Sequence, residues 1–284
     1  MAASSRVLAA YAALAVADTW LAGRLPSPGV RAARAVTKTA LVPTLAAAVP
    51  PRSPAVAVGL AGSWAGDVAL MVDGPRAFRA GVASFAVAHG GYVAALAPHV
   101  SRERMLASRR VRLMAGSTLA SAPLMGLAAH RVDPRLGVPV TAYTLTVASM
   151  AAVTQAVGSD PATRRLLAVG GAVFLASDTV LGTRDLVLAG RPDASTRWME
   201  RVVMATYTLA QALLAVGFRR LVPAAGRFDR HPTGLTDISQ TFGGALSPGP
   251  RCSAPRPRRG WSWPGPGRRA GRGGPWSPSR PCRG

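Results

Sequence analysis

Long apolar stretches follow one another along the chain, and short polar or proline-containing breaks separate them. An α-helix needs about 20 mostly apolar residues to cross the roughly 30 Å hydrocarbon layer of a bilayer. The breaks carry prolines, glycines and aspartates, which typically end helices. The pattern predicts an all-α, polytopic integral membrane bundle of eight transmembrane helices. Their windows are residues 5–23, 32–50, 54–73, 77–97, 111–129, 137–158, 163–182 and 199–218.

The hydrophobic periodicity stops near Ala224, and the rest of the chain is rich in Arg, Pro, Gly and Ser. Such a composition buries too little apolar surface to fold. We therefore predict an eight-helix transmembrane domain at residues 1–222 and a disordered tail at residues 223–284. The arginines of the tail can bind anionic lipid head groups or can simply be solvated, and both alternatives stay open.

The composition favours a membrane over a nucleic acid as partner. The formal net charge is +22, but 49% of the residues are hydrophobic and only 16% are charged. The arginines lie between the apolar stretches and in the tail, not on one basic helix, so we expect no nucleic-acid partner. Both cysteines, Cys252 and Cys282, lie in the tail, which excludes a disulfide or a Cys-rich metal site in the apolar body.

Arginine placement bears on topology, because loops rich in Lys or Arg stay in the cytoplasm. The two sides of the predicted bundle carry nearly equal numbers of arginines, and the basic tail favours two cytoplasmic termini. The excess of Arg over Lys, together with many Ala, Gly and Pro residues, is typical of a GC-rich coding sequence. We therefore predict a multi-pass protein of a bacterial cell membrane, with an oligomeric state that the sequence leaves open.

Two carboxylates, Asp67 and Asp178, lie inside apolar stretches. A charge at the centre of a membrane helix costs roughly 2.5–3.5 kcal/mol, so such residues usually face a polar cavity and have a function there. Consecutive helices run antiparallel, which assigns every residue a relative depth. Six polar residues fall in the same half of the bilayer: Asp18, Lys38, Asp67, Tyr143, Asp178 and Tyr207.

Helical spacing adds further members to this polar group. His89 and Tyr92 share one face of their helix with Phe85, and Gln211 shares a face with Tyr207. A single polar pocket can collect all of them. Less specific roles also stay open: tyrosines as interfacial anchors, His89 as a core residue, and Lys38 as the structural partner of one carboxylate. One histidine and two acids are a weak metal signal, so we predict no metal and no cofactor.

The chemistry of such a pocket follows from its two carboxyl groups. In a medium of low dielectric constant they cannot both ionise easily, so one keeps its proton. A protonated acid beside an anionic base suits acid-catalysed ether cleavage or hydrolysis by an activated water. The sequence contains no Ser-His-Asp spacing, nucleophile elbow, phosphate-binding glycine loop or HExxH motif.

At these residues the sequence resembles the YhhN-like membrane family, which includes the lysoplasmalogenases. The resemblance covers about residues 5–220 and departs from the family at Thr39, where proline is frequent, and in the tail. It is carried by five segments in matching order: TKTALVPTL with Lys38, GSWAGDVALM with Asp67, FRAGVASFAVAHGGY with His89 and Tyr92, GAVFLASDTVL with Asp178, and VMATYTLAQALLAVG with Tyr207 and Gln211.

The resemblance implies a membrane-embedded hydrolase without a metal that cleaves the vinyl ether bond of lysoplasmalogen and releases a fatty aldehyde. It implies Asp67, Asp178 and His89 as catalytic residues. It also implies that Lys38, Tyr92, Tyr207 and Gln211 bind the lysophospholipid substrate. Two alternatives use the same residues: a lipid or small-solute carrier that breaks no bond, and a purely structural membrane protein.

Overall fold

The computed structural model describes residues 2–188 and 194–221. The chain divides into two units, Met1–His231 and Pro232–Gly284, and all described residues belong to the first. The predicted tail lies outside the described residues. The helices are α1 (Ala2–Ala22), α2 (Pro28–Ala48), α3 (Pro54–Ala69), α4 (Pro75–Leu96), η1 (Ala97–His99), α5 (Arg102–Ala107), α6 (Arg109–Val132), α7 (Gly137–Thr154), α8 (Pro161–Gly182), η2 (Thr183–Val187) and α9 (Ala194–Arg220).

A long helix forms at each of the eight predicted windows, and the part of the chain that is described contains no strand, so the all-α prediction is confirmed. Several helices begin at a proline in the first turn, where its missing N–H costs no hydrogen bond. Serine or aspartate side chains cap four of the long helices by accepting hydrogen bonds from first-turn amides. The short helix α5 was not predicted, because its six residues are too few to show a period.

Four helical segments are long and apolar enough to cross a membrane: Pro75–His99, Gly137–Thr154, Pro161–Val187 and Ser195–Arg220. Within the described residues the other four long helices do not meet this standard. Helix α3 has only 16 residues, and α2 carries three cationic side chains. The chain is thus a helical membrane protein with four candidate spans, and eight crossings stay a prediction.

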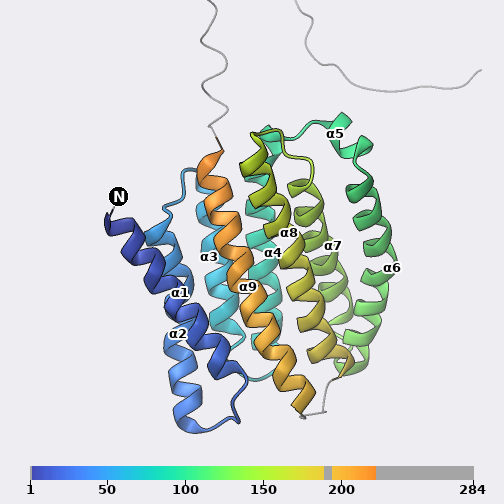
Figure 1. Cartoon of the computed structure of the whole chain (residues 1–284). Helices are drawn as coiled ribbons and strands as arrows, with labels where there is room; N and C mark the ends of the chain where they lie inside the picture. Colours follow the sequence, from blue (N-terminus) through green and yellow to red (C-terminus); the bar gives the residue numbers. More distant parts are fainter. Residues whose placement is uncertain (1, 189–193, 222–284) are drawn as a thin grey trace, which may run out of the picture. The chain divides into compact units, whose positions relative to one another are not determined.

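Seven of the long helices in the described part of the chain form a closed ring. Each of α1, α2, α3, α4, α7, α8 and α9 contacts the next, and α9 returns to α1. Helix α6 lies outside this ring and packs on α7 and η2, at the edge of the bundle in Figure 1. The polar residues predicted from the sequence come from the seven ring helices and none from α6.

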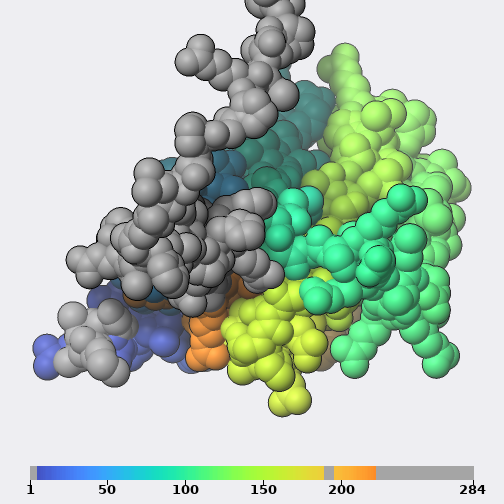
Figure 2. Space-filling view, turned by 90° about the horizontal axis from the view of Figure 1, so that it is seen from above, coloured from blue at the N-terminus to red at the C-terminus, as the bar shows by residue number. Residues whose placement is uncertain are grey.

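At one end of the bundle the chain before α5 lies beside the loop that leads into α8 (Figure 2). The Gly158 N–H donates to the His99 carbonyl over 2.7 Å, and Val100 forms a β-bridge with Val157. Asp160 caps α8, and its hydrogen bonds with Thr163 lower the pKa of its carboxyl group to about 2. These contacts close the end of the bundle that is remote from the predicted pocket.

Helices α3 and α4 approach each other closely enough that glycine is required at the contact. A Cβ atom on Gly62 would lie 2.8 Å from the Ser84 carbonyl oxygen, and one on Gly91 would lie 2.7 Å from the Ala55 carbonyl oxygen. Both neighbours are backbone atoms, which cannot move aside without shifting a helix. Small residues at such contacts allow membrane helices to pack by close van der Waals contact.

Gly91→Ala is therefore expected to lower the free energy of unfolding by about 1–3 kcal/mol, the usual cost of overpacking a dense core. The matched control is Gly90→Ala, because a Cβ atom at Gly90 meets no atom within 4 Å. Thermal unfolding of both variants in detergent measures the difference. Equal midpoints for the two variants would contradict the close contact between α3 and α4.

Candidate active site

A cavity of about 390 Å³ lies between the ring helices, and we call it the reaction cavity. It reaches the loop between α3 and α4 at Asp73 and Gly74, so it occupies the end of the bundle opposite to α5. The structure brings together here five of the six residues that share one predicted depth: Lys38, Asp67, Tyr143, Asp178 and Tyr207. Asp18 does not line the cavity.

Asp67 on α3 faces the reaction cavity with both of its oxygens engaged. Its Oδ1 lies 3.5 Å from the Lys38 ammonium of α2, and its Oδ2 accepts a hydrogen bond of 2.6 Å from the Tyr207 hydroxyl of α9. The Asp67 side chain is 4% exposed and that of Lys38 is 13% exposed. The buried Asp67 carboxyl thus has a cation beside one oxygen and a hydrogen-bond donor at the other.

A chain of hydrogen bonds supports Tyr207 from behind the cavity. Gln211 donates to the Tyr207 hydroxyl over 3.2 Å and accepts from the Tyr92 hydroxyl over 2.9 Å. The Tyr92 hydroxyl also lies 3.5 Å from the Ser63 hydroxyl. Tyr92 and Gln211 are buried and do not line the reaction cavity. Both side chains connect to the cavity through the Tyr207 hydroxyl.

Asp178 on α8 belongs to a second polar group. The Tyr143 hydroxyl of α7 donates to its Oδ2, and His89 Nε2 lies 3.3 Å from the same hydroxyl and 3.8 Å from Oδ2. Among the described residues, Asp178 forms no ion pair with a lysine or arginine. His89 is fully buried, and its Nδ1 has no hydrogen-bond partner among the residues that the structure describes. The two carboxylates therefore differ, because only Asp67 has a permanent cation beside it.

Aromatic rings fill the space around these two polar groups. The Phe174 ring contacts His89 edge-on at 4.8 Å and Tyr207 at 5.5 Å, measured between centroids. Phe85 contacts Tyr207 in the same manner at 6.1 Å. These rings bury the polar side chains in an apolar surrounding, which strengthens electrostatic interactions inside the cavity.

A second cavity of about 290 Å³ adjoins the reaction cavity, and we call it the apolar cavity. Tyr143 and Asp178 line both cavities, whereas Asp67 lines only the reaction cavity. Apart from several hydroxyl groups and the carboxyls of Asp178 and Asp185, the apolar cavity is lined by apolar side chains of α4, α6, α7, α8 and η2, such as Val82, Met125 and Leu175. Asp178 therefore stands where a polar and an apolar compartment meet.

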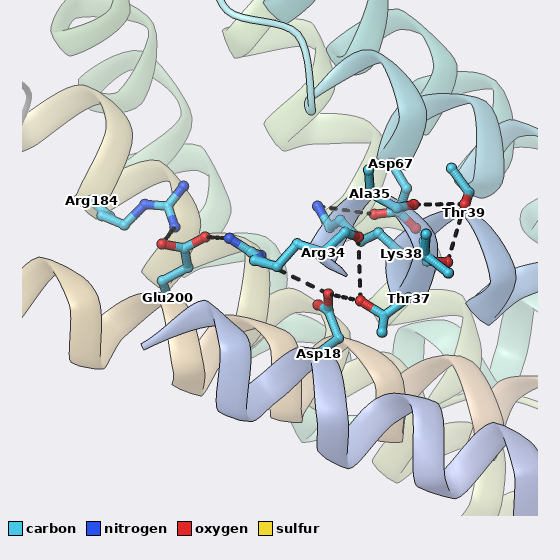
Figure 3. A network of polar contacts seen from close by, with 10 residues as sticks. Asp18, Arg34, Ala35, Thr37, Lys38, Thr39, Asp67, Arg184 and Glu200 are labelled. Carbon is cyan, nitrogen blue, oxygen red and sulfur yellow. Dashed lines mark hydrogen bonds and ion pairs between the residues drawn. The ribbon is translucent and has the colours of Figure 1, made fainter. Parts of the chain in front are cut away.

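Figure 3 shows a charged cluster whose members Arg34, Arg184 and Glu200 line the reaction cavity and were missed in the sequence analysis. Glu200 of α9 pairs with Arg34 of α2 and with Arg184 of η2. The sequence contains two signals for it. Arg34 lies one helical turn before Lys38, and Glu200 is one of only two glutamates in the chain. Asp18, fully buried on α1, belongs to this cluster, because its Oδ1 lies 3.7 Å from Arg34 Nε and accepts from Thr37.

In the described part of the chain, no group of three or more His, Cys, Asp or Glu side chains is arranged to hold a metal ion. The reactive groups of the site are two carboxyls, a lysine, a histidine and two tyrosine hydroxyls. This set can transfer protons, stabilise a cation and orient a water molecule.

The comparison with curated proteins and the comparison with solved structures each gave no match. The YhhN family model matches residues 33–218. This range spans all seven residues predicted as catalytic or substrate-binding and covers most of the chain. Because the family model covers most of the chain, including the ring helices that carry the site residues, the chain belongs to the YhhN family.

Proposed function

We propose that the protein is a membrane-embedded hydrolase that cleaves the vinyl ether bond of lysoplasmalogen-like lysophospholipids. The observation that carries this proposal is the position of Asp178 at the junction of the reaction cavity and the apolar cavity. An amphiphile with one hydrocarbon chain matches these two compartments, with its chain in the apolar one and its head group in the other. The bond that joins chain and head group then lies at Asp178. Membership of the YhhN family is consistent with this activity.

The two carboxyl groups have different surroundings, and this difference assigns one as the anion and the other as the proton donor. Lys38 compensates the charge of Asp67, so Asp67 serves as the anion. Asp178 borders the apolar cavity as well as the reaction cavity and forms no ion pair with lysine or arginine in the described chain, so Asp178 serves as the proton donor. Two titratable groups with different surroundings are the usual basis of acid and base roles.

The reaction then has three steps. The Asp178 carboxyl transfers its proton to the alkenyl carbon that is not bonded to oxygen, which leaves an oxocarbenium ion on the adjacent carbon. The Asp67 carboxylate stabilises this cation electrostatically. A water molecule attacks the cationic carbon and returns a proton to Asp178, and the resulting hemiacetal collapses into a fatty aldehyde and the glycerol hydroxyl of the head group. One water molecule is consumed and both carboxyls end in their initial states.

The remaining polar residues position these groups. Tyr143 and His89 orient the Asp178 carboxyl, and Tyr207 orients Asp67 through the bond of 2.6 Å. Tyr92 and Gln211 hold Tyr207 in place. His89, Tyr92 and Gln211 lie outside the lining of both cavities, so their proposed roles are positioning rather than direct contact with substrate.

All eight long helices cross the membrane in this proposal, with both termini in the cytoplasm of a bacterial cell. The four long helices that miss the length or hydropathy criteria for a span include α2 and α3, whose side chains Lys38 and Asp67 line the reaction cavity. A charge that faces a polar cavity does not have the cost of one that faces acyl chains.

Purified full-length protein in detergent tests the activity. A 1-alkenyl lysophospholipid should yield a fatty aldehyde, whereas the saturated 1-alkyl analogue should yield none. In D₂O the aldehyde should gain one deuteron on the carbon next to its carbonyl, and in H₂¹⁸O the glycerol product should gain no ¹⁸O. Binding of the alkenyl lipid without any product would contradict the proposal and favour a carrier.

A further inference from the structure

The charged cluster lies at the boundary between the reaction cavity and a third, wider cavity. This third cavity has a volume of about 1200 Å³ and is bounded by the loops at the same end of the bundle; we call it the vestibule. Arg34, Arg184 and Glu200 line both the vestibule and the reaction cavity. Any ligand that passes from the vestibule to the two carboxyls therefore passes these three side chains.

Glu200 contacts the two arginines with different oxygens. Its Oε1 pairs with Nη1 of Arg34, and its Oε2 lies 3.7 Å from Nη1 of Arg184. A phosphodiester also has two oxygens, its non-bridging ones, that share one negative charge. It can therefore lie between two guanidinium groups as the Glu200 carboxylate does. Guanidinium groups bind phosphate and carboxylate with the same planar fork.

Each arginine keeps a second carboxylate partner when Glu200 leaves. Arg34 Nε lies 3.7 Å from Oδ1 of the buried Asp18, and Arg184 Nε lies 2.6 Å from Oδ1 of Asp185. The Glu200 side chain is 28% exposed, so its carboxylate can turn toward the vestibule and be hydrated there. The two arginines thus stay oriented while the group between them is exchanged.

A third arginine adds positive charge at the same place. Arg31 lies one turn before Arg34 on α2 and lines both the vestibule and the reaction cavity. It forms no ion pair within the part of the chain that the structure describes. The boundary thus carries three guanidinium groups, of which Arg34 and Arg184 also pair with Asp18 and Asp185, and Arg31 adds a cation without such a partner.

We infer that Arg34 and Arg184 form a binding site for the phosphate group of an anionic or zwitterionic ligand, and that Glu200 occupies this site until the ligand displaces it. The inference deepens the proposed function, because it places the head group of a lysophospholipid at the mouth of the reaction cavity. The hydrocarbon chain then extends past Asp178 into the apolar cavity.

Three probes separate phosphate recognition from chain recognition: a 1-alkyl lysophosphatidylcholine, the 1-alkylglycerol without phosphate, and glycerophosphocholine without chain. None of them contains a vinyl ether, so binding is measured without turnover on full-length protein in a maltoside detergent. The wild type should bind the alkyl lysophospholipid more tightly than the alkylglycerol, and salt should weaken only the former.

Glu200→Gln removes the internal competitor and should tighten binding of both phosphate probes by about 3- to 10-fold, with no change for the alkylglycerol. Arg34→Gln and Arg184→Gln should weaken the phosphate probes by roughly 10- to 100-fold. The matched control is Arg165→Gln, an exposed arginine at the opposite end of α8, which should change nothing. Competition with inorganic phosphate shows whether the site takes free phosphate or requires the diester.

The inference is overturned if folded Glu200→Gln protein binds the phosphate probes no better than the wild type. It is also overturned if the wild type does not distinguish alkyl lysophospholipid from alkylglycerol, a result that needs no variant. Failure of the hydrolase proposal has a different signature: phosphate-dependent binding with the expected Glu200→Gln effect, but no aldehyde from the alkenyl lipid.

Discussion

Asp178→Asn should lower aldehyde release from a 1-alkenyl lysophospholipid by about 10²- to 10⁴-fold, the usual contribution of a general acid. Asparagine has the size of aspartate and can still accept the Tyr143 hydrogen bond, so the fold is retained. It carries no acidic proton for the alkenyl carbon. Initial rates with saturating substrate measure the loss, and the alkyl lysophospholipid should bind the variant as it binds the wild type.

The matched control is Asp73→Asn, because Asp73 also lines the reaction cavity but is exposed and forms no ion pair within the described residues. Its turnover should equal that of the wild type. A further readout tests the proton transfer itself, because protonation of the alkenyl carbon predicts a slower reaction in D₂O. Full activity in Asp178→Asn would disprove the assignment of Asp178 as donor.

Lys38→Met should lower the free energy of unfolding by about 3–5 kcal/mol, because it leaves the Asp67 carboxylate buried without its cation. The Lys38–Asp67 contact of 3.5 Å joins α2 to α3, and both side chains are largely buried. Removing one partner of a buried ion pair lowers the free energy of unfolding more than removing both partners does. The double variant Lys38→Met/Asp67→Asn should therefore recover most of the stability but none of the turnover.

Reversible unfolding in mixed detergent micelles measures these differences, and a double-mutant cycle isolates the pair. Arg79→Met is the matched control. Arg79 and Asp133 lie 3.8 Å apart, and their side chains are 32% and 24% exposed. A partly exposed ion pair contributes about 0.2–1 kcal/mol to the free energy of unfolding. If Lys38→Met is as stable as the wild type, the pair is not a buried structural contact. If the double variant is as unstable as the single one, the loss comes from packing rather than charge.

The local features of this fold follow from the sequence. Apolar windows predict each long helix and first-turn prolines predict where four of them begin, since both signals act within one helix. Antiparallel order predicts a common depth for Asp67, Asp178 and Lys38, because depth depends only on position along the helices. The sequence therefore determined which polar residues are able to meet in one half of the helical bundle.

Other features depend on how the helices rotate and which of them become neighbours. Only the tertiary structure pairs Lys38 with Asp67 rather than Asp178, and only it places Asp178 beside an apolar cavity. Glu200 reaches Arg34 through a contact between α2 and α9, elements far apart in the chain. No local pattern encodes this contact, because the packing of seven helices in a ring sets each helix's rotation. The sequence thus determined the helices and the depth of their polar groups, while long-range packing decided the partner of each charge.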